Sequence, residues 1–233
     1  MNLFAIGDLH LPGGQDKPME VFGPQWDRHF SRISENWREQ VRPEDLVLIP
    51  GDISWAMTMA DAMPDLEAIG ALPGRKVMIR GNHDYWWSGI GKVRAALPAD
   101  MFALQQDAME WEDFVVCGTR GWMIPTEDAP LDPREEKIYR RELVRLDLAL
   151  DAAKRLAKGR PIVVMLHYPP LYLGQRSSGF TERMERAGVR ICVYGHLHGG
   201  GIAAGFNGEQ GGIRYWLTSC DSQDFKLRKI NFL

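Results

Sequence analysis

The fold is decided by a stretch near the start of the chain, residues 3–10, which reads LFAIGDLH. Its first half, Leu3–Ile6, is an unbroken apolar run, and such runs are typical of strands that are buried on both faces of a sheet. One glycine later the chain places Asp8 and His10, whose side chains are common metal ligands. The stretch therefore predicts a buried strand that presents two metal-binding side chains at its carboxyl end.

The same local pattern occurs four more times, always as a short apolar run that ends in polar residues able to bind a metal. The later runs are Leu46–Ile49 before Asp52, Val77–Ile79 before Asn82, His83 and Asp84, Ile162–Leu166 before His167, and Ile191–Tyr194 before His196 and His198. In open α/β sheets, ligands bind beyond the carboxyl ends of the strands. We therefore expect the five ends to share one crevice.

Segments between the runs have helical spacing, as the crossovers of parallel strands require. Residues 26–37 carry one apolar face, and a second helix is expected to begin after Asp132 and to end before Gly159. After residue 200 the pattern indicates strands, which we interpret as an antiparallel set completing a second sheet. These segments are 201–206, 213–219 and 225–232.

Composition indicates one ordinary globular α/β domain over residues 1–233 and excludes disordered, collagen-like and coiled-coil classes. The net charge of −3 disfavours a long nucleic acid as partner. No apolar stretch is long enough for a membrane helix. The three cysteines lie far apart without a Cys-x-x-Cys motif, which argues against disulfides and thiolate zinc sites. We expect a cytoplasmic protein.

Each strand-end fragment has a plainer interpretation when it is taken alone. Asp8 and Asp52 could cap helices, and His196 and His198 could be polar residues of a turn. Five of the six histidines lie at these strand ends, however, and mixed nitrogen and oxygen donors suit borderline divalent metals. The ordered set therefore favours a metal site. The remaining histidine, His29, is interpreted as a surface or packing residue.

Taken in order, these fragments resemble the signature of the calcineurin-like metallophosphoesterases. The matching motifs are Asp8-Leu9-His10, Gly51-Asp52, Gly81-Asn82-His83-Asp84, His167 and Gly195-His196-Leu197-His198. The resemblance implies a two-sheet mixed β sandwich flanked by helices. One departure is the segment Ile53–Trp55, where relatives often place another acidic residue. A lipid A precursor substrate is disfavoured, because the superfamily members that cleave it carry Arg in place of His83.

The resemblance also implies roles for the motif residues. One metal would be held by Asp8, His10, Asp52 and His198, and the second by Asp52, Asn82, His167 and His196. Asp52 would bridge two divalent or trivalent ions, for which Mn²⁺, Zn²⁺ and Fe are all admissible. His83 would donate a proton to the leaving oxygen or clamp the transition state, and Asp84 would orient it.

The leading hypothesis is a dinuclear phosphohydrolase that cleaves a small phosphomonoester or phosphodiester by in-line attack of a metal-bridging hydroxide. One alternative is a non-catalytic metal-binding scaffold, although all seven expected ligands are present. Another is a nuclease, which would need a local basic groove. The arginines that could form it are Arg80, Arg120, Arg176 and Arg183.

Aromatic residues accompany the loops that carry the motifs, and they have two interpretations. Trp55, Trp86, Trp87 and Tyr168 could pack beneath these loops and hold the ligands in place. Alternatively, at least one of Trp55, Trp86 and Tyr168 could form a wall on which a planar leaving group stacks. The second interpretation predicts a preference for nucleotide or aryl esters.

Overall fold

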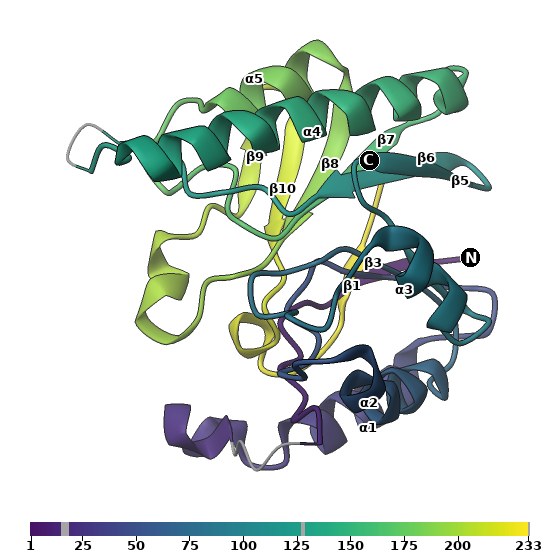
Figure 1. The fold of residues 1–233 in the computed structure, drawn as a ribbon. Coiled ribbons are helices and arrows are strands. Elements are labelled where there is room, and N and C mark those ends of the chain that lie inside the picture. Colours follow the sequence, from purple (N-terminus) through teal and green to yellow (C-terminus); the bar gives the residue numbers. More distant parts are fainter. Residues whose placement is uncertain (15–18, 127–128, 233) are drawn as a thin grey trace. The chain divides into compact units, whose positions relative to one another are not determined.

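The computed structural model describes residues 1–14, 19–126 and 129–232, which form two compact units (Figure 1). Unit 1 comprises Met1–Ala103 and Thr218–Leu233, and unit 2 comprises Leu104–Leu217. Each unit has its own sheet and its own hydrophobic core. The expectation of a single domain over residues 1–233 stays a prediction.

Unit 1 contains a five-stranded sheet in the order β11-β1-β2-β3-β4. Its strands are β1 (Leu3–Ala5), β2 (Leu46–Ile49), β3 (Arg75–Met78), β4 (Met101–Ala103) and β11 (Arg228–Ile230). The first four run parallel to their neighbours, and only the edge strand β11 is antiparallel. Because β1, β2 and β3 are parallel, the loops that follow them emerge at the same edge of the sheet.

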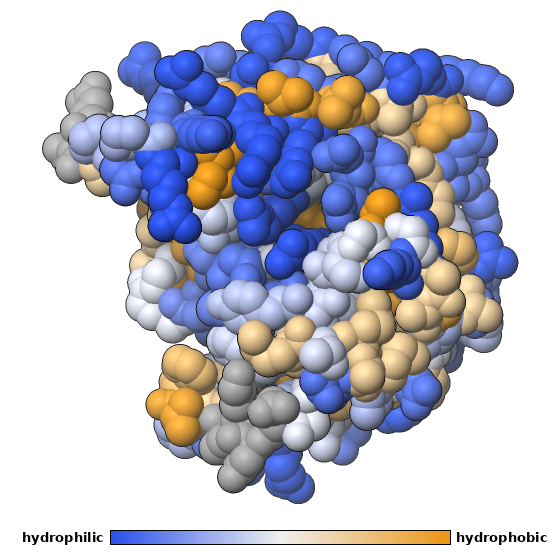
Figure 2. Space-filling model, in the orientation of Figure 1, coloured by the Kyte–Doolittle hydropathy of each residue, from blue (hydrophilic) through white to orange (hydrophobic). Residues whose placement is uncertain are grey.

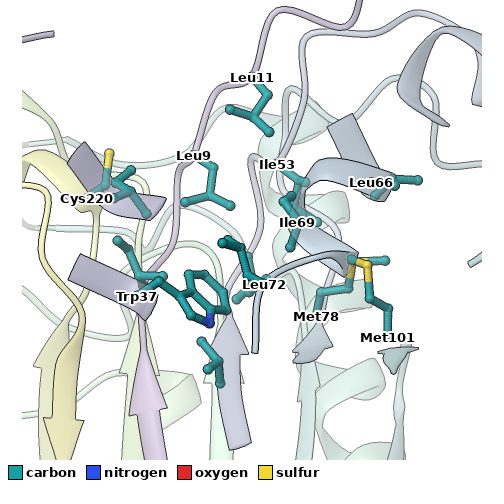
Figure 3. Close-up of a cluster of buried hydrophobic side chains, with 14 of the residues drawn as sticks. Leu9, Leu11, Trp37, Ile53, Leu66, Ile69, Leu72, Met78, Met101 and Cys220 are labelled. Carbon is teal, nitrogen blue, oxygen red and sulfur yellow. The ribbon is translucent and has the colours of Figure 1, made fainter. Parts of the chain in front are cut away.

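Three α-helices connect the strands of unit 1: α1 (His29–Gln40), α2 (Met59–Gly70) and α3 (Ile90–Ala96). The core combines side chains of α1, such as Trp37, and of α2, such as Leu66, with those of the strands and their loops (Figure 3). Leu9 and Ile53, which lie in the loops after β1 and β2, point into this core. The loops that carry the first motifs are therefore anchored by apolar burial.

A buried lysine completes the carboxyl end of α2. Lys76 is 1% exposed, and its ammonium group donates hydrogen bonds to the carbonyl oxygens of Gly70, at 3.0 Å, and Leu72. These carbonyls lie at a helix end, where intrahelical partners are lacking and positive charge is favoured. Burial lowers the pKa of Lys76. The carbonyl oxygens at the carboxyl end of α2 therefore stabilise the buried ammonium group of Lys76.

Unit 2 contains a six-stranded sheet in the order β5-β6-β7-β8-β10-β9. Its strands are β5 (Asp107–Trp111), β6 (Phe114–Thr119), β7 (Ile162–Leu166), β8 (Val189–Tyr194), β9 (Gly208–Gln210) and β10 (Ile213–Leu217). Strands β6, β7, β8 and β10 are parallel, whereas β5 and β9 are antiparallel edge strands. The loops after β6, β7 and β8 therefore leave the sheet at one edge.

Two helices, α4 (Pro133–Ala157) and α5 (Gly179–Arg186), cover one face of this sheet (Figure 1). The expected start of α4 is confirmed, because the side chain of Asp132 accepts hydrogen bonds from the backbone N–H groups of Arg134 and Glu135, both at 2.8 Å. The outer surface of α4 is mostly hydrophilic, with a few apolar side chains (Figure 2). Among the latter, Val144 and Leu148 are exposed.

The five expected strands exist, and they are divided between the two sheets of the expected two-sheet fold. Three of them are in unit 1 and two are in unit 2. The late strands differ from expectation. Residues Gly199–Ala204 form a 3-10 helix, β10 pairs parallel with β8, and β11 joins the sheet of unit 1. Four of the six residues of the first segment are Gly or Ala, which are depleted in strands. Local patterns also do not specify the partner of a strand.

In the described part of the chain, none of the helices has the length and the apolar composition that crossing a membrane requires. Cys117, Cys192 and Cys220 are free thiols, as expected, and all are buried. Burial raises the pKa of each thiol above its ordinary value. These cysteines are therefore packing residues with low reactivity.

Candidate metal centre

The loop after β1 pairs backbone to backbone with the loop after β2, and both belong to unit 1. The bonds run from Asp8 N to Gly51 O (2.9 Å), His10 N to Asp52 O (3.0 Å), Leu11 N to Ile53 O (2.9 Å) and Trp55 N to Leu11 O (2.9 Å). Asp8, His10 and Asp52 all have positive φ, at 57°, 46° and 50°. Left-handed backbone costs about 1–2 kcal/mol for a residue with a Cβ. Strained residues of this kind concentrate at functional sites, so the two paired loops are a candidate site.

These loops bring two carboxylates and one imidazole together in unit 1. Asp8 is 0% exposed and Asp52 is 2% exposed. A carboxylate oxygen of Asp8 lies within 4.8 Å of a carboxylate oxygen of Asp52, and a carboxylate oxygen of Asp8 lies within 4.8 Å of a ring nitrogen of His10. The His10 Nε2 atom is 3.8 Å from Asp52 Oδ2. Two buried carboxylates this close repel each other unless a cation or a proton is near. The donor set therefore fits a metal ion.

The loop after β3 contacts the other carboxylate oxygen of Asp52. The backbone N–H of His83 donates to Asp52 Oδ1 at 2.8 Å. A Cβ on Gly81 would lie 2.0 Å from the same oxygen, which is shorter than any real contact, so only glycine fits there. Asn82 lies between these two residues and is half-buried. Unit 1 thus brings all six of its predicted site residues into three adjacent loops.

Asp84 fixes the geometry of these loops. Its Oδ1 accepts hydrogen bonds from Ile53 N at 2.9 Å, Ser54 N at 3.2 Å and Trp86 Nε1 at 3.0 Å, and its Oδ2 accepts one from Gly81 N at 2.7 Å. The carboxylate is fully buried. Asp84 therefore joins the loop after β2 to the loop after β3. Its expected role in orienting His83 stays a prediction.

Trp55 lies directly against two imidazoles of unit 1, those of His10 and His83. Its ring stacks on His10 at 4.9 Å with an interplanar angle of 22°, and it is 4.4 Å from the His83 ring. The indole N–H donates to Met19 Sδ at 3.3 Å. Trp55 thus holds both histidines by packing, in line with the first interpretation of the aromatic residues. Its use as a substrate wall stays a prediction.

Trp86 and Trp87 belong to the interior of unit 1, since each is 2% exposed. The Trp86 indole N–H is bonded to Asp84, and its ring lies 5.4 Å from that of Trp87. A side chain so buried cannot offer a face to a leaving group. The stacking interpretation, which needs at least one of Trp55, Trp86 and Tyr168, therefore does not extend to Trp86, whose indole is used to hold Asp84.

Unit 2 carries the remaining predicted ligands in the loops after β7 and β8. His167 is fully buried, whereas His196 and His198 are half-buried. The rings of His167 and His196 are 5.1 Å apart, and His196 has a positive φ of 74°. Tyr168 is 6% exposed and packs on His196 at 4.1 Å, which supports a packing role for it as well.

Arg120, which follows β6, also belongs to this edge of the unit 2 sheet. Its carbonyl oxygen accepts the backbone N–H groups of His167 and Tyr168, both at 3.0 Å. Its guanidinium lies 4.5 Å from the Trp122 ring and 3.7 Å from buried Glu142. Arg120 therefore supports the loop that carries His167 and is part of an internal network.

Two further contacts in unit 1 escaped sequence analysis. Asp65, on α2, accepts hydrogen bonds from Ser54 Oγ at 2.6 Å and Gly13 N at 2.7 Å, and burial raises its pKa. The Cys220 thiol lies 3.1 Å from the carbonyl oxygen of Asp8. Neither residue is part of a motif, so no local signal could have found them. Both stabilise the backbone of the loops that carry predicted ligands.

Comparison with known proteins was made on sequence and on fold. The sequence matches the Calcineurin-like phosphoesterase family over residues 1–200. The Gene 66 protein of Mycobacterium phage D29 is 44% identical over 89 residues, so the chain spans only 40% of the length of that relative, with 36% of its own length. The Gene 66 protein of Mycobacterium phage L5 is 25% identical over 204 residues, which are 84% of this chain and 77% of the phage protein.

Among solved structures, the phosphopantetheinyl hydrolase of Mycobacterium tuberculosis is similar to this chain, with a TM-score of 0.57 and 14% identity over 98% of this chain and 95% of that protein. At this identity the likeness concerns the fold, and it agrees with the two mixed sheets and flanking helices. The family match covers every predicted site residue. The chain therefore belongs to the calcineurin-like phosphoesterase family.

Proposed function

We propose that the donors of the two units together hold two metal ions and that the protein hydrolyses a small phosphomonoester or phosphodiester. The first metal would take Asp8, His10, Asp52 and His198 as ligands, and the second would take Asp52, Asn82, His167 and His196. The proposal requires the loops of unit 1 and unit 2 to serve one common site.

The observation that carries the proposal is the environment of Asp52. Its Oδ1 accepts the backbone N–H of His83 at 2.8 Å, and its Oδ2 lies 3.8 Å from His10 Nε2. The two oxygens therefore face different partners, as a bridging carboxylate requires. Asp8 supplies a second negative charge within 4.8 Å. A carboxylate whose two oxygens face different partners, next to a second carboxylate, supplies oxygen donors for more than one cation, which supports the proposal of two metals.

When bound, two such ions lower the pKa of water and neutralise the phosphoryl oxygens of the substrate. The side chains of the protein would supply the proton for the leaving group and hold the reacting groups in position. The ring of His83 lies 5.8 Å from that of the proposed ligand His10, and this proximity to the metals supports a role for His83 as proton donor to the leaving oxygen. Trp55 holds both rings in place by packing. Asp84 keeps the backbone of the His83 loop fixed through Gly81 N.

The substrate class is best approached with a panel. The metal-loaded protein is assayed with phosphomonoesters, phosphodiesters, nucleotides and pyrophosphates, and with a phosphopantetheinyl ester because a protein of similar fold is named for that group. We expect turnover of at least one monoester or diester that is lost on chelation. The matched control is His83→Ala, which should keep its metals and lose turnover.

The alternatives give different results in the same panel. A non-catalytic scaffold would bind metal and hydrolyse none of these compounds. A nuclease would degrade oligonucleotides and leave small esters intact. Either result would overturn the proposed substrate class.

A further inference from the structure

His29 is the histidine that lies outside the motifs, and it contacts a motif loop. It is the first residue of α1 and is 8% exposed, so it is not a surface residue. Its Nε2 atom lies 2.9 Å from the carbonyl oxygen of Leu9, and its Nδ1 atom lies 3.3 Å from the carbonyl oxygen of Trp26. Leu9 stands between the two predicted ligands Asp8 and His10.

The peptide group between Leu9 and His10 is thereby held on both sides. Its carbonyl oxygen faces His29 Nε2, and its N–H donates to the carbonyl oxygen of Asp52 at 3.0 Å. This peptide precedes a left-handed residue, since His10 has a φ of 46°. Rotation of the peptide toward an ordinary conformation would turn the His10 side chain away. Both hydrogen bonds oppose that rotation.

The tautomer of His29 follows from its surroundings. Burial lowers the pKa of the imidazole, so the ring is neutral and carries one N–H. Both ring nitrogens face carbonyl oxygens, and the shorter contact, to Leu9, identifies Nε2 as the donor. The Trp26 ring packs edge-on against both His29 at 5.2 Å and His10 at 6.2 Å. Packing against Trp26 therefore holds the His29 ring next to the loop that carries His10.

We propose that His29 is a positioning residue that holds the Leu9–His10 peptide so that His10 is presented as a metal ligand. The inference rests on the proposed function, because it assigns His10 to a metal. Groups that orient metal ligands in this way typically contribute 10-fold to 100-fold in metal affinity.

The test compares two amide substitutions that separate the two ring nitrogens. His29→Gln keeps a donor near the position of Nε2, and His29→Asn keeps one near Nδ1 only. Mn²⁺ binding to the metal-free, folded variants is measured by isothermal titration calorimetry. We expect His29→Asn to weaken binding about 10-fold or more and His29→Gln to stay within about threefold of wild type. If His29→Asn does not fold, His29→Met replaces it, since Met has the length of Gln and no donor.

The matched control is Trp37→Phe in the same helix. Trp37 also donates a ring N–H to a backbone carbonyl, that of Pro73 at 2.8 Å, far from the motif loops in sequence. Its loss should lower stability and leave the Mn²⁺ affinity unchanged. Equal Mn²⁺ affinities for wild type and His29→Asn, or His29→Met where it replaces it, would overturn the role of His29 alone. A Trp37→Phe variant whose Mn²⁺ affinity falls as much as that of the His29 variant would also overturn it. A wild type that binds no Mn²⁺ would overturn the proposed function as well.

Discussion

The predicted ligands of unit 1 and those of unit 2 follow the same kind of strand end, but they are held differently. In unit 1 the loops after β1, β2 and β3 are joined by backbone hydrogen bonds and by Asp84, which accepts four N–H groups. In unit 2 the ring of half-buried His196 packs on Tyr168, and half-buried His198 directly precedes the 3-10 helix Gly199–Ala204. The loops of unit 1 therefore share a buried carboxylate in addition to backbone hydrogen bonds, whereas those of unit 2 are held by backbone hydrogen bonds, such as Gly195 N to His167 O at 3.1 Å, and by ring packing.

The difference indicates that the positions of the predicted ligands in unit 1 are fixed by the protein itself. Asp8 and Asp52 are buried anions that must be positioned before a metal binds, because their mutual repulsion would otherwise separate them. Imidazoles bind a metal in the neutral form, so imidazole ligands do not repel one another in this way. Substitutions in the two regions should therefore affect stability and metal binding in different proportions.

The largest effect is expected for Asp52→Ala. Removal of this carboxylate takes away a ligand of both proposed metals, so the purified variant should carry neither and should lose turnover. His198→Ala should lose one metal only, and Asp61→Asn, on α2, should keep both. Metal content is measured by mass spectrometry. Two tightly bound metals in Asp52→Ala would contradict the bridging role.

The next effect concerns His83→Ala, which should fold, keep its metals and lose about 10²-fold to 10⁴-fold in turnover as a missing general acid. The loss should be larger for alkyl esters than for nitrophenyl esters, because nitrophenolate leaves without a proton. The measurement is kcat on a matched ester pair. Equal losses on the two esters would show that His83 clamps the phosphoryl group instead.

Asp84→Ala tests how much the buried Asp84 carboxylate contributes to the stability of the unit 1 loops. Four N–H groups would lose their acceptor inside unit 1, and a buried unsatisfied donor costs about 1–3 kcal/mol, so we expect a loss of about 3 kcal/mol or more in the free energy of unfolding. Urea denaturation of the metal-free protein measures it. The control Asp147→Ala removes an ion pair with Arg183 that is partly exposed, which should cost about 0–1 kcal/mol. His198→Ala should also stay within about 1 kcal/mol. Similar losses in all three variants would remove the contrast between the units.

The smallest expected effect is that of Trp86→Phe. It deletes the one hydrogen bond from Trp86 Nε1 to Asp84 and keeps most of the buried ring, so the free energy of unfolding should fall by about 1–2 kcal/mol. Turnover of aryl and alkyl esters should change in parallel. A selective loss of the aryl preference would restore Trp86 as part of a substrate wall.

Sequence predicted the strand ends well, because each apolar run is long enough to indicate a buried strand. Two runs match their strands residue for residue, β2 (Leu46–Ile49) and β7 (Ile162–Leu166). The start of α4 was also predictable from Asp132, whose side chain caps it. The ordered motifs identified the family, which the match over residues 1–200 confirms.

Sequence could not predict which strands share a sheet. The apolar character of β8 and β10 is compatible with either direction of pairing, so their parallel arrangement depends on tertiary contacts. The residues that support the motif loops could not be predicted either, because their contacts also depend on the tertiary structure. Asp65 and Cys220 reach the motif loops only through the fold, and neither residue has a distinctive sequence neighbourhood.

The central claim is that donors of both units hold two metals at one site. The most direct measurement is a crystal structure of the Mn²⁺-loaded protein with anomalous scattering recorded at the metal edge. We predict two peaks about 3.5–4 Å apart, both within bonding distance of Asp52, one of them bound by His198 and the other by His167 and His196. A single peak, or two peaks bound only by residues of unit 1, would contradict the account.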